Sequence, residues 1–231
     1  MRPVTRAIYV TGTDTGAGKS LAAATLLAAL NAHGVRAVGM KPVASGCEHT
    51  PAGLRNADAE LLIAHSAGAP AYADVNPYAF ADPIAPHLAA ADAGVAINPA
   101  RIEAAFAALS ANAQFLVVEG VGGWMAPFGP RLMQADIARG LQLPVILVVG
   151  LRLGCLNHAL LTARAIRADG AELIGWIGSC VDAQMARRED NLATLRERLD
   201  APCLGVLPYR AAAGPATLAA HLDAACDRLL G

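Results

Sequence analysis

The sequence predicts an α/β fold in which a mostly parallel central sheet is flanked by helices on both faces. Short apolar runs of strand length alternate along the chain with longer runs of helical periodicity. This alternation is typical of a parallel sheet covered by helices. Two of the apolar runs, residues 115–118 and 144–149, are continuous, as expected for strands buried on both faces. The length of 231 residues suits one domain over residues 1–231.

A glycine-rich stretch near the start, GTDTGAGKS at residues 12–20, fits the phosphate-binding pattern G-x-x-x-x-G-K-[ST]. Glycines let backbone N–H groups surround an anion, and the start of the following helix adds a positive field. Lys19 can reach the outer phosphates, and the Ser20 hydroxyl can bind Mg²⁺. The stretch predicts a P-loop NTPase whose nucleotide contacts are Gly12, Thr13, Asp14, Thr15, Gly16, Ala17, Gly18, Lys19 and Ser20.

The remaining elements follow from periodicity and from breaks at glycine and proline. The predicted strands are residues 7–10, 36–40, 115–118, 144–149, 173–179 and 203–207. The predicted helices are residues 21–33, 58–65, 99–112, 136–141, 157–168, 188–199 and 217–230. We expect loops at 47–57 and 151–156, and a mostly irregular stretch at 70–99 that borders the substrate.

Polar residues follow several predicted strands at the point where each strand ends. Lys41 and Ser45 follow the second strand, Glu119 the third and Asn157 the fourth. Because ligands of open parallel sheets bind at the carboxyl ends of the strands, these side chains are expected to share a crevice with the P-loop. Lys41 either neutralises charge on a transferring phosphoryl group or only extends its amine to water. Asn157 is either a helix N-cap, which its position favours, or part of an anion site.

A carboxylate after an apolar strand is the usual second partner of Mg²⁺ in P-loop proteins, and Glu119 occupies that place. Mg²⁺ prefers octahedral oxygen ligands and keeps several waters. Asp58 is a possible second carboxylate, which spacing alone does not decide. The glycines at 120, 122 and 123 let the backbone approach a ligand, or form a flexible turn.

Composition argues against several classes of protein. The net charge is −1, with 18 basic and 19 acidic residues and no basic block, which argues against a nucleic-acid partner. The five cysteines are scattered without a CxxC pair, so we expect reduced thiols in the cytoplasm and neither a disulfide framework nor a zinc site. The P-loop begins too early to follow a signal peptide, and the longest apolar run, 143–151, is too short to span a membrane.

Several longer segments together resemble the dethiobiotin synthetases, a family of ATP-dependent carboxylases of biotin synthesis. The matching segments extend nearly from end to end of the chain. They are YVTGTDT at 9–15, GKS at 18–20, KPVASG at 41–46, GLRNAD at 53–58, NPY at 76–78, VEGVGGW at 118–124, LPVILVVG at 143–150, GCLNHA at 154–159 and GVLP at 205–208. A P-loop alone indicates only a superfamily, whereas KPVASG and GCLNH together are far more specific.

The resemblance implies a ligase that converts 7,8-diaminopelargonate, CO₂ and MgATP to dethiobiotin, ADP and phosphate. The 7-amino group forms a carbamate, whose oxygen attacks the γ-phosphorus to give a carbamic–phosphoric anhydride. The 8-amino group then closes the ureido ring and releases phosphate. Carbamate and triphosphate are both anionic, so the site must position them and neutralise their charge.

The resemblance also implies roles for single residues and a homodimer. Thr15, Lys19 and Lys41 form the catalytic set, with Lys41 bridging carbamate and γ-phosphate. The substrate-binding set is Lys41, Ser45, Gly122, Leu156 and Asn157. The Mg²⁺ set is Ser20, Asp58 and Glu119, and Glu119, Ser179 and Pro208 complete the nucleotide site. In this family the partner subunit supplies the site for the substrate carboxylate, which reverses the N-cap interpretation of Asn157.

Three residues depart from a familiar version of the family. Position 16 is Gly instead of Glu, position 20 is Ser instead of Thr, and position 179 is Ser instead of an Asn that contacts adenine. A serine has fewer hydrogen-bonding atoms than an amide, so we expect looser base selectivity. Comparing ATP with CTP and GTP tests this, and a strict preference for ATP would count against it.

Two other functions share this fold. One is a P-loop ATPase that dimerises on ATP and acts as a switch on a protein partner or a surface. Residues 13–17 lack the early lysine of such proteins, and the tail at 218–230 has Arg228 as its one Lys or Arg, so it lacks the basic face of a membrane-binding helix. The other is an amidating relative that makes a different acyl phosphate, against which the Asn157 segment argues.

Overall fold

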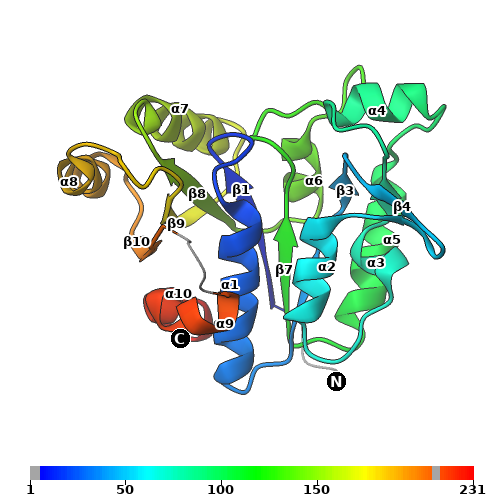
Figure 1. Cartoon of the computed structure of the whole chain (residues 1–231), viewed down its shortest axis with the longest axis horizontal. Helices are drawn as coiled ribbons and strands as arrows, with labels where there is room; N and C mark the ends of the chain where they lie inside the picture. The colour runs from blue at the N-terminus through cyan, green and yellow to red at the C-terminus, as the bar shows by residue number, and fades with distance from the viewer. Residues whose placement is uncertain (1–5, 210–213) are drawn as a thin grey trace.

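The computed structural model describes residues 6–209 and 214–231 and has a six-stranded parallel sheet at its centre. The strand order is β10-β9-β8-β1-β7-β2, and every neighbouring pair is parallel (Figure 1). The strands are β1 Arg6–Gly12, β2 Ala37–Met40, β7 Phe115–Glu119, β8 Val145–Leu151, β9 Leu173–Cys180 and β10 Cys203–Leu207. The predicted fold class is confirmed.

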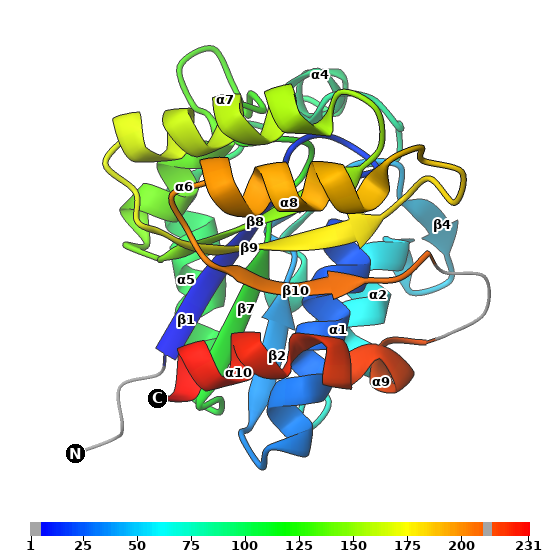
Figure 2. The same cartoon turned by 90° about the vertical axis from the view of Figure 1, so that its left-hand side faces the viewer.

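Helices cover both faces of this sheet, as Figure 2 shows. On one face lie α1 Lys19–Ala32, α9 Pro215–Leu218, a 3-10 helix Ala219–Leu222 and α10 Asp223–Leu230. On the other lie α5 Pro99–Ser110, α6 Gln134–Gly140, α7 Cys155–Ala168 and α8 Arg188–Arg198. Alternate residues of each central strand enter the two cores: Ile8 and Val10 pack with α1, whereas Tyr9 packs with the opposite layer.

The order of the strands brings the polar strand ends together. β1 lies between β7 and β8, and β2 lies beyond β7, so the four strands that carry the predicted site are neighbours. After β2 the chain leaves this sheet at Pro42 and forms β3 Val43–Ala44, which pairs with β6 Tyr78–Ala79. The helix α2 Ala57–Ala64 follows. It begins at Ala57 because the Asn56 side chain caps it and accepts hydrogen bonds from two N–H groups of its first turn.

Two local predictions were wrong. Residues 47–57 are not a plain loop, because β4 Glu48–Thr50 and β5 Gly53–Arg55 form an exposed hairpin whose turn is closed by the Thr50 hydroxyl. The stretch 70–99 is mostly irregular, as predicted, although it contains the short elements α3 Tyr72–Val75, β6 and α4 Pro86–Asp92. The helix expected to begin at residue 157 begins at Cys155.

The start of this helix, α7, has a physical explanation. Its N-cap is Gly154 at φ 95°, a conformation that residues with a Cβ rarely adopt. The strand before it also continues past Gly150 to Leu151. Asn157 is therefore the third residue of α7 and not its cap. Among the described residues, no helix is both long and apolar enough to cross a membrane.

Candidate active site

The phosphate-binding loop joins the end of β1 to the start of α1. Gly16 and Gly18 have φ values of 78° and 89°, and Gly18 is the N-cap of α1. No side chain caps this helix, so its first N–H groups face the loop without a side-chain acceptor. Uncapped N–H groups at the positive end of a 14-residue helix suit a phosphate group.

Lys19 lies inside the loop and is only 7% exposed. Its ammonium donates to the carbonyl oxygens of Asp14 at 2.9 Å and Gly122 at 2.7 Å. Burial, and then the nearby charge of Lys41, lowers the pKa of Lys19 to about 8. The Lys19 ammonium thus contacts two carbonyl oxygens, where the motif predicts contacts with phosphate oxygens.

Lys41, the first residue after β2, is 2% exposed and points at the same place. Its ammonium lies 2.6 Å from Glu119 Oε1, 3.1 Å from Asp58 Oδ2 and 3.0 Å from the Gly120 carbonyl oxygen. Burial alone would lower the pKa of Lys41, but the two carboxylates outweigh it and raise that pKa. The interpretation of Lys41 as a water-exposed amine is therefore wrong. Lys19 and Lys41 are the only lysines of the sequence, and both lie here.

Glu119 is the last residue of β7, and its side chain is fully buried. Its Oε1 accepts hydrogen bonds from Ser20 at 2.8 Å and from Lys41, while its buried Oε2 has no hydrogen-bond partner among the described residues. Burial alone would raise the pKa of the Asp58 carboxyl, but the ammonium of Lys41 holds that pKa below its usual range. The site thus holds two carboxylates, those of Glu119 and Asp58, close to the Ser20 hydroxyl and the Lys41 ammonium.

This set of oxygens suits Mg²⁺. Ser20, Glu119 and Asp58 supply hard oxygen atoms, and the free Oε2 of Glu119 is an available acceptor. In the part of the chain that the structure describes, no three His, Cys, Asp or Glu side chains gather as a metal site. A cation here would take its remaining ligands from phosphate oxygens and water.

The other predicted nucleotide residues surround the loop. Thr13 donates to the Asp14 carboxylate, and Asp14 forms an ion pair with Arg152 from the segment after β8. Thr15 is exposed, with its hydroxyl near Gly122. Ser179 on β9 is 2% exposed and packs against Gly18, where an added Cβ would lie 2.2 Å from the serine oxygen. Pro208 is exposed directly after β10.

The predicted substrate residues are only partly joined to this cluster. The Gly122 carbonyl contacts Lys19, but the side chains of Ser45, Leu156 and Asn157 have no hydrogen bond or ion pair to either lysine among the described contacts. Ser45 lies just after β3, and its carbonyl oxygen is 3.5 Å from the side-chain nitrogen of Asn56. Leu156 and Asn157 lie in the first turn of α7.

A buried hydrogen-bond chain that the sequence did not reveal fixes Lys41 and Asp58 together. Asn76 donates to the Lys41 carbonyl at 2.6 Å and accepts from the Tyr72 hydroxyl at 3.0 Å. That hydroxyl accepts the backbone N–H of Asn56, which caps the helix carrying Asp58. The segments that contain Asn56 and Asn76 resembled the family, and that resemblance was the only signal available for them.

A hollow of about 530 Å³ adjoins the phosphate-binding loop. It is lined by Thr13, Asp14, Thr15, Gly123, Trp124, Met125, Ala126, Leu161, Thr162 and Ala165. Met125 and Leu161 are 54% and 55% exposed, and Leu153, just before α7, is 96% exposed. Large apolar side chains therefore face solvent close to the loop.

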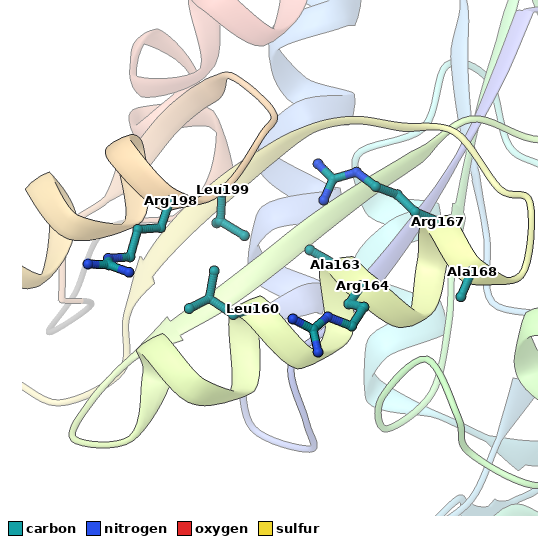
Figure 3. Close-up of a pocket in the computed structure, with 7 residues that line it drawn as sticks. All are labelled: Leu160, Ala163, Arg164, Arg167, Ala168, Arg198 and Leu199. Carbon is teal, nitrogen blue, oxygen red and sulfur yellow. The ribbon is translucent and has the colours of Figure 1, made fainter.

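A second hollow, of about 650 Å³, lies between α7 and α8 (Figure 3). Leu160 and Leu199 lie opposite each other in it, with three arginine side chains around them. Those arginines lie near the C-terminal ends of the two helices, where a cation is favoured by the helix dipole. None of the predicted site residues lines this hollow, so its volume does not mark the active site.

Fold and site together define a P-loop nucleotide-binding protein, and a family model described as an AAA domain matches residues 6–217. The chain is 59% identical over 217 residues to the ATP-dependent dethiobiotin synthetase BioD of Xanthomonas oryzae pv. oryzae, covering 94% of this chain and 97% of that one. It is 55% identical over 218 residues to that of Pseudomonas aeruginosa, covering 94% and 96%. The chain belongs to the ATP-dependent dethiobiotin synthetase family, as its motifs predicted.

Solved structures give the same fold from distant sequences. The septum site-determining protein MinD of Pyrococcus horikoshii, complexed with Mg-ADP, aligns with a TM-score of 0.60 at 15% identity over 98% of both chains. A chain of the MinC:MinD cell division protein complex of Aquifex aeolicus aligns with a TM-score of 0.56 at 12% identity, covering 90% of this chain and 83% of that one. These similarities concern the fold alone.

Proposed function

We propose that this ATP-dependent ligase carboxylates 7,8-diaminopelargonate with CO₂ and closes the ureido ring at the lysine cluster of the P-loop. The observation that supports it is the meeting of two buried ammonium groups, Lys19 and Lys41, beside the carboxylate of Glu119. Joining a carbamate to a triphosphate requires positive charge between two anions. A buried lysine whose pKa is raised by two carboxylates supplies that charge at neutral pH.

Lys41 serves the first two chemical steps. The 7-amino nitrogen adds to CO₂ and loses a proton, which leaves a carbamate anion. A carbamate oxygen then attacks the γ-phosphorus, and the bond to the ADP oxygen breaks. Lys41 orients the carbamate oxygen toward the phosphorus, while Thr15, Lys19 and the uncapped first turn of α1 hold the triphosphate. In the last step the 8-amino nitrogen attacks the carbonyl, loses a proton and expels phosphate.

Mg²⁺ would be held by Ser20, Glu119 and Asp58 together with phosphate oxygens. It would neutralise negative charge on those phosphates. Ser45 is proposed to hydrogen-bond the diamine or carbamate end, and the Gly122 backbone to lie against the diamine. Ser179 and Pro208 are proposed to border the nucleotide base. Ser179 is buried against Gly18, so its hydroxyl has little room to reorient toward different nucleotide bases.

The diamine's carboxylate is proposed to bind at the start of α7 in a partner subunit of a homodimer. Like α1, this helix begins at a positive-φ glycine without a side-chain cap, so its first N–H groups suit an anion. Asn157 lies in that turn, and the exposed Leu153 and Leu161 lie beside it. A patch of exposed apolar side chains next to a site is typical of a subunit interface.

Leu153→Glu tests the dimer. We expect it to weaken subunit association and raise KM for the diamine at least tenfold, because a charge placed on an apolar interface loses its water. Sedimentation equilibrium and initial rates measure both effects. Ala104→Glu, at an exposed position of α5, is the control and leaves both unchanged. A wild-type chain that is monomeric at enzyme concentrations of the assay would contradict the dimer.

The lowered pKa of Lys19 predicts a pH dependence of nucleotide binding. Phosphate binds the protonated amine, so above about pH 8 binding must take up a proton, and Kd for ADP is expected to rise toward tenfold per pH unit. Calorimetry between about pH 7 and about pH 10 measures Kd without the complications of CO₂ and diamine ionisation. Lys19→Arg, whose cation does not titrate, should bind with a flat profile. A flat profile in the wild type would contradict the prediction.

The decisive experiment for the activity is phosphate release from MgATP and bicarbonate, with and without the diamine. Release that requires the diamine supports the ligase, whereas release that ignores it favours a switch ATPase. The five free cysteines of the structure fit a reducing compartment, and we propose that the enzyme is cytoplasmic.

A further inference from the structure

Gln134, the first residue of α6, is fully buried and uses its whole carboxamide. Its side-chain oxygen accepts the backbone N–H of Val121. Its side-chain nitrogen donates to the Gly123 carbonyl oxygen at 2.9 Å and to the Thr11 hydroxyl at 3.2 Å. Because a backbone N–H only donates, the amide oxygen must face Val121, which fixes the orientation of the group. One acceptor and two donors are all satisfied.

These three partners belong to the two segments that build the active site. Thr11 is buried on β1, one residue before the phosphate-binding loop begins. Val121 and Gly123 belong to the loop that follows β7, which we call the glycine loop, residues 120–123. Gln134 therefore fastens the glycine loop to the strand that carries the P-loop.

The glycine loop is shaped around this amide. A Cβ at Gly120 would lie 2.4 Å from the Gln134 side-chain oxygen, so the amide occupies the space that any other residue at 120 would need. Gly122 has a φ of 64°, which turns the loop back toward the P-loop. The backbone N–H of Gln134 also donates to the Ala126 carbonyl oxygen at 2.8 Å, which closes the far end of the turn.

The glycine loop supplies one carbonyl to each lysine of the site. Gly120 accepts from Lys41 at 3.0 Å, and Gly122 accepts from Lys19 at 2.7 Å. Val121, whose N–H is bound by Gln134, lies between these two residues in the chain. A displacement of the loop would therefore move both acceptors together, and with them both ammonium groups.

We propose that Gln134 is a positioning residue for phosphoryl transfer: by fixing the glycine loop it sets where the ammonium groups of Lys19 and Lys41 lie. This inference rests on the roles proposed for the two lysines. A buried and fully satisfied polar network holds a single arrangement, and reacting groups displaced by about 1 Å lose rate on the order of 100-fold. The three hydrogen bonds of the Gln134 side chain all go to protein atoms, so the proposed role is to position other groups.

The test compares Gln134→Met, which keeps the volume and removes the hydrogen bonds, with Gln134→Glu, which keeps the shape and replaces the donors. For both we expect kcat to fall about 10- to 100-fold while KM for ATP changes less than about threefold. Labelling the two lysines with ¹³C at Cε gives a spectrum with one signal for each, and we expect both signals to shift in both variants.

Ile137→Ala is the matched control, because Ile137 is a buried residue of the same helix that packs in the core. It should lower the melting temperature as much as the Gln134 substitutions or more, but leave kcat per folded enzyme and both lysine signals unchanged. A purely structural Gln134 would behave like Ile137 in every measurement. Folded Gln134→Met with wild-type kcat and unshifted lysine signals would overturn the proposal.

Lys41→Ala, assayed beside these variants, separates the proposed role of Lys41 from that of Gln134. If Lys41→Ala keeps its activity, the proposed role of the lysine fails whatever Gln134 does. If Lys41→Ala is inactive and Gln134→Met is fully active, the role of the lysine stands and only the positioning role of Gln134 is lost. Should Gln134→Met not fold, the isosteric Gln134→Glu decides the question alone.

Discussion

Replacing Lys41 with alanine is expected to reduce diamine-dependent phosphate release by at least about 100- to 1,000-fold. Lys41 is 2% exposed, and its ammonium contacts Glu119, Asp58 and the Gly120 carbonyl. A charged side chain from the protein surface therefore cannot replace this ammonium. The charge it carries is proposed to lie between the carbamate and the γ-phosphate. Phosphate release by a coupled assay, with kcat expressed per folded enzyme, measures the loss.

The substitution also has a structural consequence that the assay must separate. Without Lys41 the fully buried Glu119 loses its counter-charge, and breaking such a pair costs about 3–5 kcal/mol. The amount of ADP bound measures the fraction of the variant that is folded, because Lys19 and the P-loop are intact in it. Arg196→Ala, which removes an exposed cation from α8, is the control and should retain wild-type rates. Diamine-dependent release by Lys41→Ala within about threefold of wild type would contradict the proposed role.

Where strand ends decide the position of side chains, the sequence predicted correctly which of them lie close together. Lys41 and Glu119 each follow an apolar run, and because β2 and β7 are neighbours in a parallel sheet, the two side chains meet. Asp58 also lies beside Lys41, because it is in the first turn of a helix capped by Asn56. The spacing of residues in the sequence could not predict this position. The hairpin at 47–57 was missed because its strands are short and exposed and lack apolar alternation.

Gln134 could not be found in this way. It begins a helix well after the strand end at Glu119, and only the path of residues 124–133 returns it to the glycine loop. A glutamine at the start of a helix is ordinary in sequence, and only its complete burial makes it notable. The start of α7 was also missed, because a positive-φ glycine in the N-cap position is less common than the Asn cap expected at 157.

Glu119→Gln is the second change from which we expect a large effect, on both activity and stability. It removes the proposed Mg²⁺ ligand together with the nearest counter-charge of Lys41, and we expect kcat to fall at least about 100-fold. Stability should fall by about 3 kcal/mol at neutral pH, at the low end for a broken buried pair because Asp58 still contacts Lys41 at 3.1 Å. Urea unfolding measures the stability.

The pH dependence of this destabilisation gives a signed test. In the wild type the pKa of Lys41 is raised, so its contribution is complete below the unfolded value and is lost as pH rises through the folded pKa. In Glu119→Gln burial dominates and lowers that pKa, so the variant regains stability as pH rises toward about 10. The difference between wild type and variant, in which the contribution of Lys19 cancels, should therefore be smaller at about pH 9.5 than at about pH 7. A difference that grows or stays constant would contradict the account.

A double variant separates charge pairing from catalysis. Adding Lys41→Met to Glu119→Gln leaves no uncompensated lysine, so stability should return to within about 1 kcal/mol of the wild type. Activity should not return, because both the cation and the carboxylate are absent. Glu60→Gln, which breaks an exposed contact with Arg55, is the control and should change stability by less than about 1 kcal/mol. Recovery of stability without activity would mean that the buried pair is kept for the reaction, since an uncharged pair holds the fold equally well.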